Sequence, residues 1–214
     1  GMLAKFGIWS EPISGLLIAA AAAAFAGLIS GFVLLRTTGL TLLMLTMCTM
    51  LLLEEAANLA HDWTGGFDGL DGVDVQPVFG LFAFSPLYPS VQYLYALAVL
   101  AVGYVVVRTI VYSPFGQSLT GIRENTLRMH AVGAPVRMRL IVCYTISAGI
   151  AGIAGGLWAQ AHASVNLSTL GLDRAATVLI ILVLGGYGRL YGAFVGAVAY
   201  MALTHFLAKV YPTA

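Results

Sequence analysis

Long apolar stretches alternate with short polar connections along the chain. Four of these stretches reach the roughly 20 residues that a helix needs to cross the hydrocarbon core of a bilayer. They are residues 13–35, 39–60, 91–112 and 140–161. Their length and apolar character predict an all-α integral membrane protein.

The last apolar region, residues 175–208, is interrupted by the glycine-rich sequence GGYGRLYG. Its second part, residues 190–208, is long enough to span the membrane. Its first part, residues 175–188, is about 21 Å long as a helix, which is less than the thickness of the core. We expect either a short helix extended by the preceding loop or a broken, partly re-entrant one. The chain therefore has about six transmembrane or partly re-entrant helices.

Small residues recur at every fourth position in several of these stretches. The rows are Ala148, Gly152 and Gly156; Ala151, Gly155 and Ala159; Gly188, Gly192 and Gly196; and Gly27 with Gly31. In lipid, such rows allow helix backbones to approach closely, so tight packing is the simplest interpretation. The functional interpretation is a translocation path or gate that opens and closes. Its candidate residues are Gly152, Gly156, Gly185, Gly186, Gly188 and Gly192.

Composition and charge support the membrane assignment and give it an orientation. Hydrophobic residues make up 60% of the chain and charged residues 9%, which excludes an ordinary soluble domain. If residues 113–139 are cytoplasmic, seven of the ten Lys and Arg residues lie on or near that side, as the positive-inside rule requires. The loop at residues 61–90 has four aspartates and no Lys or Arg. It is therefore predicted to be extracytoplasmic.

The segment at residues 113–139 is the one long polar, basic connection. Ser113 and Pro114 are a helix-start signal, and Gly133 with Pro135 is a stop signal. Apolar residues fall near one face of the helix between them, namely Phe115, Leu119, Ile122 and Met129. We predict a short amphipathic helix on the cytoplasmic surface. It would lie on lipid headgroups or fit an apolar groove of a partner protein, and periodicity does not choose between these.

Glu54 and Glu55 are unusual because they lie within a stretch that is predicted to span the membrane. A carboxylate in hydrocarbon is costly, so each must face protein or water. One interpretation is a polar lining or gate for a substrate that carries an amine. The other is that one carboxylate reaches the outer interface and the second bonds a neighbouring helix.

No pattern in the chain indicates catalysis, a metal site or a nucleotide site. The four histidines lack the spacing of metal ligands, and Cys48 and Cys143 lie within apolar stretches. GGYGRLYG lacks the Gly-Lys-Ser/Thr ending of a phosphate-binding loop. We therefore expect neither an enzyme nor a bound cofactor.

Three segments, SPFGQSLTGIRENTLRMHAVGAPVRMRL, ISAGIAGIAGGLWA and VLIILVLGGYGRLYGAFVGA, resemble the permease subunits of branched-chain amino acid ABC importers, in the same order. The extracytoplasmic TGGFDGLDG resembles a segment of the LivM-type subunit. The resemblance implies a subunit of the bacterial inner membrane that binds no nucleic acid. Its implied partners are a LivH-type second permease, two cytoplasmic ATPase subunits that use the ATP, and a periplasmic substrate-binding protein.

The resemblance also assigns roles by position. The residues expected to dock on the ATPase are Arg123, Glu124, Asn125, Arg128, Ala131 and Gly133. Glu54 aligns with a glutamate in the corresponding span of the family, whereas Glu55 is an extra acid. Full-length relatives have further spans before and after the matching region. Residues 1–214 are therefore expected to be a single transmembrane permease domain that is truncated at both ends.

Two alternatives stay open. The same machinery could import urea or a short amide, because the binding protein does much of the selecting. A secondary transporter would instead couple protons through Glu54, Glu55 or His205, and it would need no ATPase.

Overall fold

The computed structural model describes residues 12–60, 70–71, 89–162, 164–166, 171–186, 188 and 190–210. Its elements are α2 (Pro12–Leu34), α3 (Leu40–Leu59), β1 (Leu70–Asp71), α5 (Pro89–Tyr112), α6 (Pro114–Glu124), α7 (Thr126–Ala131), α8 (Val136–His162), β2 (Ser164–Val165), α9 (Leu172–Gly185) and α10 (Gly192–Val210). The strands are two-residue segments that pair antiparallel, with Leu70 opposite Val165. The prediction of an all-α membrane fold is confirmed.

Four of the described helices, α2, α3, α5 and α8, are long and apolar enough to cross a membrane, and α10 contributes a shorter apolar segment. The predicted extracytoplasmic loop lies outside the described residues except for β1 and the first turn of α5. The chain divides into two compact units, Gly1–Asn166 and Leu167–Ala214. Each is described separately below.

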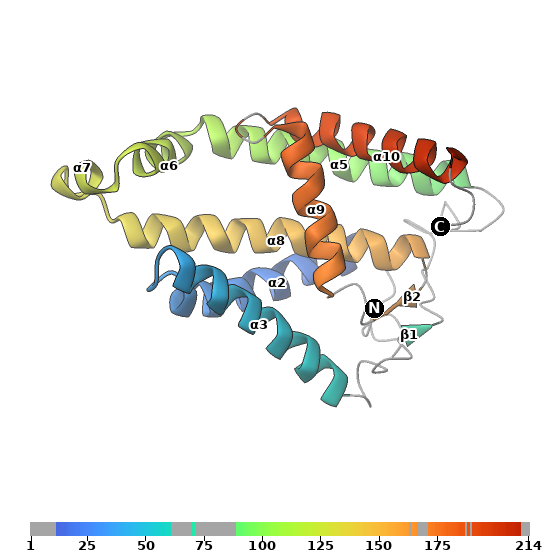
Figure 1. The fold of residues 1–214 in the computed structure, drawn as a ribbon, viewed down its shortest axis with the longest axis horizontal. Helices are drawn as coiled ribbons and strands as arrows, with labels where there is room; N and C mark the ends of the chain where they lie inside the picture. The colour runs from blue at the N-terminus through green and yellow to red at the C-terminus, as the bar shows by residue number, and fades with distance from the viewer. Residues whose placement is uncertain are drawn as a thin grey trace. The chain divides into compact units, whose positions relative to one another are not determined.

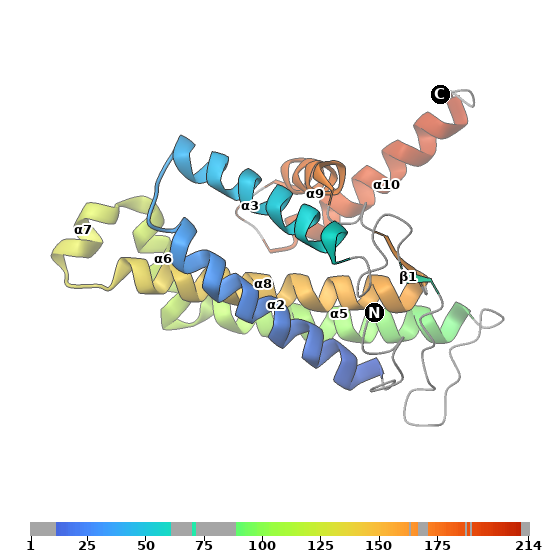
Figure 2. The same ribbon diagram turned by 90° about the horizontal axis from the view of Figure 1, so that it is seen from below.

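In the first unit, the α2–α3 turn and the α6–α7 connection lie at the same end, and the two strands lie at the other (Figures 1 and 2). At the end with the α2–α3 turn, side chains join α2 to α8. Arg137 donates from Nη2 to the carbonyl oxygen of Phe32 at 3.3 Å. The guanidinium carbons of Arg36 and Arg137 lie 5.9 Å and 5.6 Å from the centre of the Phe32 ring. Both arginines lie at the end that the sequence analysis predicts to be cytoplasmic, and that orientation stays a prediction.

The most extensive helix contact of the first unit joins α2 to α8, and glycines make it close. A Cβ atom built on Gly152 would lie 2.5 Å from the Cβ of Ala23 and 2.7 Å from the carbonyl oxygen of Ala19. A Cβ built on Gly156 would lie 2.7 Å from the Cδ2 of Leu16. The predicted row of small residues therefore packs against α2, as small residues do between helices in lipid.

Few apolar side chains of the described residues are buried within the chain. The buried ones are Leu16, Leu34, Ile122, Val136, Ile141 and Ala159. In lipid, an exposed leucine costs little, because the acyl chains are as apolar as the side chain. Helix α3 has no buried residue, so its faces remain available to lipid or to other helices.

In the second unit, α9 and α10 meet at a glycine-rich turn. A Cβ built on Gly192 would lie 2.6 Å from the carbonyl oxygens of both Gly185 and Gly186. Gly186 and Gly188 have positive φ angles of 79° and 111°, which favour glycine. Helix α9 has 14 residues and is therefore about 21 Å long. This agrees with the prediction that the segment is too short to span the core alone.

The predicted boundaries differ from the observed ones at α8. This helix begins at Val136, four residues before the predicted span. Arg137 and Arg139 therefore lie in its first turn and not in the preceding connection.

Candidate functional site

The candidate site is the connection between α5 and α8, and it starts at a well-defined helix cap. Ser113 caps α6: its Oγ accepts from the N–H of Gly116 at 3.4 Å and donates to the carbonyl oxygen of Ile110 at 2.6 Å. Pro114 follows in the first turn, where its missing N–H and fixed φ suit a helix start. The predicted helix start is confirmed.

Gly116 fixes how α6 leaves the end of α5. This residue is buried, and a Cβ built on it would collide with the carbonyl oxygen of Val111 and lie 2.7 Å from that of Ile110. Only a residue without a side chain allows this approach. As a result, the turn between α5 and α6 is a close backbone contact.

The prediction of one amphipathic helix up to Gly133 was wrong, because the helix is divided at Asn125. The N–H of Asn125 donates to the carbonyl oxygen of Gly121 at 3.0 Å and ends α6. Its Oδ1 accepts from the N–H of Arg128 at 3.0 Å and starts α7. Asparagine is among the preferred residues at this position, because its short side chain reaches backbone donors two or three residues ahead.

The predicted stop at Gly133 is confirmed. Gly133 has a φ of +80°. Its N–H donates to the carbonyl oxygen of His130 at 3.0 Å, and the N–H of Ala134 donates to that of Met129 at 3.1 Å. This pair of hydrogen bonds is the Schellman motif, which ends a helix with a left-handed residue.

The six predicted docking residues all lie on this connection, and the structure brings them together. They are Arg123, Glu124, Asn125, Arg128, Ala131 and Gly133, and every one of them is exposed. The close packing of the connection is made by other residues. Ile122 is only 6% exposed, and a Cβ built on Gly121 would lie 3.0 Å from the Sδ of Met129.

Two apolar residues that the sequence analysis missed are exposed on the same connection. Leu127 is 82% exposed and Val132 is 78% exposed. The periodicity of a single helix had placed Ile122 and Met129 on the apolar face, but both side chains pack against other residues of the chain. The break at Asn125 changes the phase of the residues that follow. The ability of Asn125 to cap a helix was the signal in the sequence that would have revealed Leu127 and Val132.

The second set of predicted residues, for a path or gate, is divided between the two units. Glu54 is half-buried and Glu55 is exposed, both on α3. Gly152 and Gly156 pack against α2, whereas Gly185, Gly186, Gly188 and Gly192 belong to the second unit. Their role in a path stays a prediction. Within the described part of the chain, no group of His, Cys, Asp and Glu is placed to hold a metal ion.

Comparison with known sequences identifies the family of the chain. The profile of one family, described as "Branched-chain amino acid transport system / permease component", matches residues 1–212. The high-affinity branched-chain amino acid transport system permease protein LivM of Escherichia coli (strain K12) is 29% identical over 218 residues. LivM of Salmonella typhimurium (strain LT2) is 30% identical over 219 residues.

Each of these alignments covers 90% of this chain and 49% of the relative. The chain thus spans about half the length of the curated relatives it matches. No solved structure matches it.

Proposed function

The chain belongs to the family of branched-chain amino acid transport system permease components, and on this premise we propose that it is a membrane-spanning subunit of an ATP-driven importer for branched-chain amino acids. The observation that carries the proposal is the α6–α7 connection. It exposes, at one end of the spans, all six residues that the sequence resemblance assigns to ATPase docking. A separate subunit would hydrolyse the ATP, as the resemblance to the permease subunits of ABC importers implies.

The proposed partners are a LivH-type permease, two cytoplasmic ATPase subunits and a periplasmic binding protein, in a bacterial inner membrane. Helix α3 supports a second permease, since none of its residues is buried and many of its apolar side chains are exposed. The outer loop at residues 61–90 would receive the substrate from the binding protein. Glu54 lies in the half of α3 next to that loop and would meet the amine of the substrate.

The α6–α7 connection would dock on the ATPase through Leu127 and Val132. Their exposed apolar side chains are suited to be the buried centre of an interface, with Arg123 and Arg128 at its polar rim. Helices α6 and α7 are also held to the spans. The turn at Gly116 joins α6 to α5, and the Schellman motif at Gly133 joins α7 to α8.

This attachment provides a route from ATP to the spans. When the ATPase subunits close, they would displace the α6–α7 connection, and α5 and α8 would move with it. The switch requires contacts that differ between the outward-facing and inward-facing states. The glycine contacts of α8 with α2 are close enough to respond to small shifts.

The test is uptake of labelled leucine by the full-length protein, co-expressed with the second permease, the ATPases and the binding protein. We expect uptake that needs ATP, resists a protonophore and is competed by isoleucine and valine. Absence of leucine uptake by an assembled complex would move the substrate toward urea or a short amide. Uptake without the ATPase would overturn the proposal in favour of a secondary transporter.

A further inference from the structure

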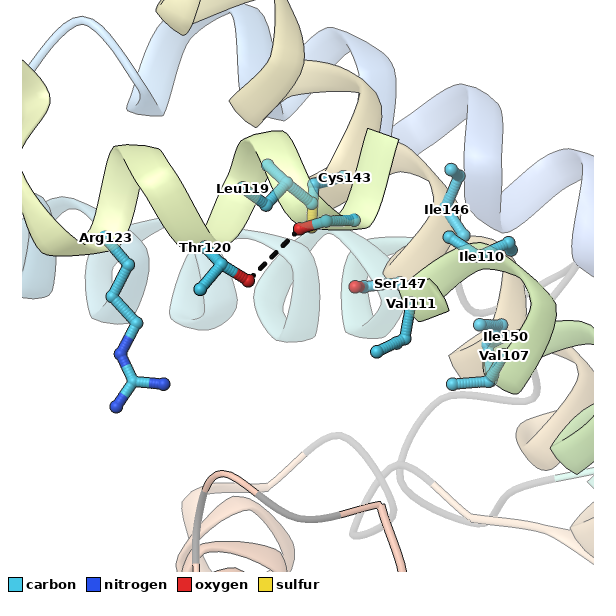
Figure 3. Close-up of a pocket in the computed structure, with 11 residues that line it drawn as sticks. Val107, Ile110, Val111, Leu119, Thr120, Arg123, Cys143, Ile146, Ser147 and Ile150 are labelled. Carbon is cyan, nitrogen blue, oxygen red and sulfur yellow. Dashed lines mark hydrogen bonds between the residues drawn. The ribbon is translucent and has the colours of Figure 1, made fainter. Parts of the chain in front are cut away.

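Helices α6 and α7 are held to the rest of the first unit with different firmness. Ile122 of α6 is only 6% exposed, and Leu119 and Thr120 of α6 face α5 and α8 across a groove (Figure 3). The hydroxyl of Thr120 also donates to the carbonyl oxygen of Gly116 at 3.3 Å. Helix α7 has six residues, and none of them is buried. A helix this short is not stable in water by itself, so α7 depends on the few contacts that it makes.

Met129 packs α7 onto α6. Among the six described residues of α7, it is the one that is not exposed. A Cβ built on Gly121 of α6 would lie 3.0 Å from the Sδ and 3.5 Å from the Cε of Met129, so the thioether rests on the α6 backbone. The side-chain hydrogen bonds of Asn125 and Thr126 act at the start of α7. Met129 therefore holds the body of the helix against α6.

A methionine in this position is open to a chemical change that undoes the contact. Met129 is partly exposed, and a short segment with few buried contacts opens readily to solvent, so a small oxidant reaches the sulfur. Hydrogen peroxide transfers one oxygen atom to Sδ. The O–O bond breaks, an S–O bond forms and water leaves, and the sulfur gives up the two electrons that the peroxide gains. The sulfoxide is polar, and keeping it against Gly121 would cost its hydrogen bonds to water.

We propose that Met129 is an oxidation-sensitive modification site, at which a peroxide converts the thioether to the sulfoxide and thereby releases α7 from α6. Leu127 lies two positions earlier and therefore on the opposite face of α7. Met129 thus stays outside an interface that is centred on Leu127. Once α7 is released, it no longer presents Leu127 in a fixed place, and association with the ATPase falls. This second effect rests on the docking function proposed above, whereas the release of α7 does not.

The test is amide hydrogen exchange of the intact protein in a mild detergent, before and after treatment with hydrogen peroxide. Peptide mass spectrometry verifies the added oxygen at Met129. The amides of Val132 and Ala134 measure the stability of α7, since they donate to the carbonyl oxygens of Arg128 and Met129. We expect their exchange to become about fivefold faster on oxidation, as the lost burial of one half-buried methionine predicts. Met129→Leu keeps the volume and the apolar character, so the same treatment should leave its exchange unchanged.

Met138→Leu is the matched control. Met138 lies in the first turn of α8 and is 60% exposed, so peroxide oxidises it, but it does not pack on Gly121. This variant should therefore respond to peroxide as the unaltered protein does. The proposal is overturned if Met138 is oxidised while Met129 is not, if oxidation of Met129 leaves the exchange unchanged, or if Met129→Leu responds as the unaltered protein does.

Co-purification with the ATPase separates this proposal from the docking function. Faster exchange together with weaker association, both prevented by Met129→Leu, is the expected result. Faster exchange with unchanged association would support the release of α7 by oxidation and would contradict the docking of α7 on the ATPase.

Discussion

The backbone N–H of Arg128 donates a 3.0 Å hydrogen bond to the Oδ1 of Asn125, and this contact divides the connection between α5 and α8 into two helices. Asn125 is extended, with φ −156° and ψ 100°. It therefore ends one helix and starts the next within a single residue. The consequence is that Leu127 points away from the chain although Ile122 is buried.

Replacing Asn125 by alanine should loosen α7. The side-chain acceptor is lost, which typically costs ~1 kcal/mol of helix stability. Amide hydrogen exchange of residues 126–131 in the intact protein should therefore become about fivefold faster. Asn125→Asp is the control, because a carboxylate accepts the same hydrogen bond. Equal exchange in the alanine and aspartate variants would show that the cap does not hold α7.

Replacing Gly133 by valine should impair coupling to the ATPase. The left-handed conformation at φ +80° costs an ordinary L-residue roughly 1–2 kcal/mol, and more for a β-branched side chain. No atom lies within 4 Å of a Cβ built there, so backbone strain and not crowding is tested. Gly133→Asn should retain most function, since asparagine tolerates this conformation. Leucine uptake and co-purification with the ATPase measure the effect, and equal values for both variants would contradict it.

Local signals in the sequence were enough to predict the ends of the connection between α5 and α8. Ser113 with Pro114 and Gly133 each act through their own backbone and nearest neighbours, so no tertiary information is needed. Asn125 carries an equally local signal, but the apolar periodicity across it favoured one continuous helix. That competition between period and capping explains why Leu127 and Val132 were missed.

The long-range part of the site could not be predicted in the same way. The row that contains Gly152 and Gly156 indicated close packing, but nothing in the row identifies α2 as its partner. Helix α2 is the partner because its Ala19 and Ala23 lie beside Gly152 in the folded chain.

The glycine contact of α8 with α2 predicts different effects for two neighbouring glycines. Gly152→Ala should lower the midpoint temperature of unfolding in detergent, since its Cβ would meet Ala23 and Ala19 and force the helices apart, at a cost of roughly 1–3 kcal/mol. Gly155→Ala is the matched control on the same helix. No atom lies within 4 Å of its added Cβ, so it should gain only helix propensity. If both variants shift the midpoint equally, the close contact does not limit stability.

The exposed side chain of Leu127 predicts where the ATPase binds. Leu127→Ala should weaken association of the ATPase subunits with the intact permease in nanodiscs about tenfold, because truncating one central apolar anchor of an interface typically costs more than ~1 kcal/mol. His130→Ala is the control, since His130 is exposed on the same helix. The alternative is that α7 lies on lipid headgroups. In that case Leu127→Ala and His130→Ala would bind the ATPase equally well, and only Leu127→Ala would make α7 more accessible to water-soluble quenchers. A loss of ATPase binding confined to Leu127→Ala requires that a protein surface, and not the bilayer, covers this side chain.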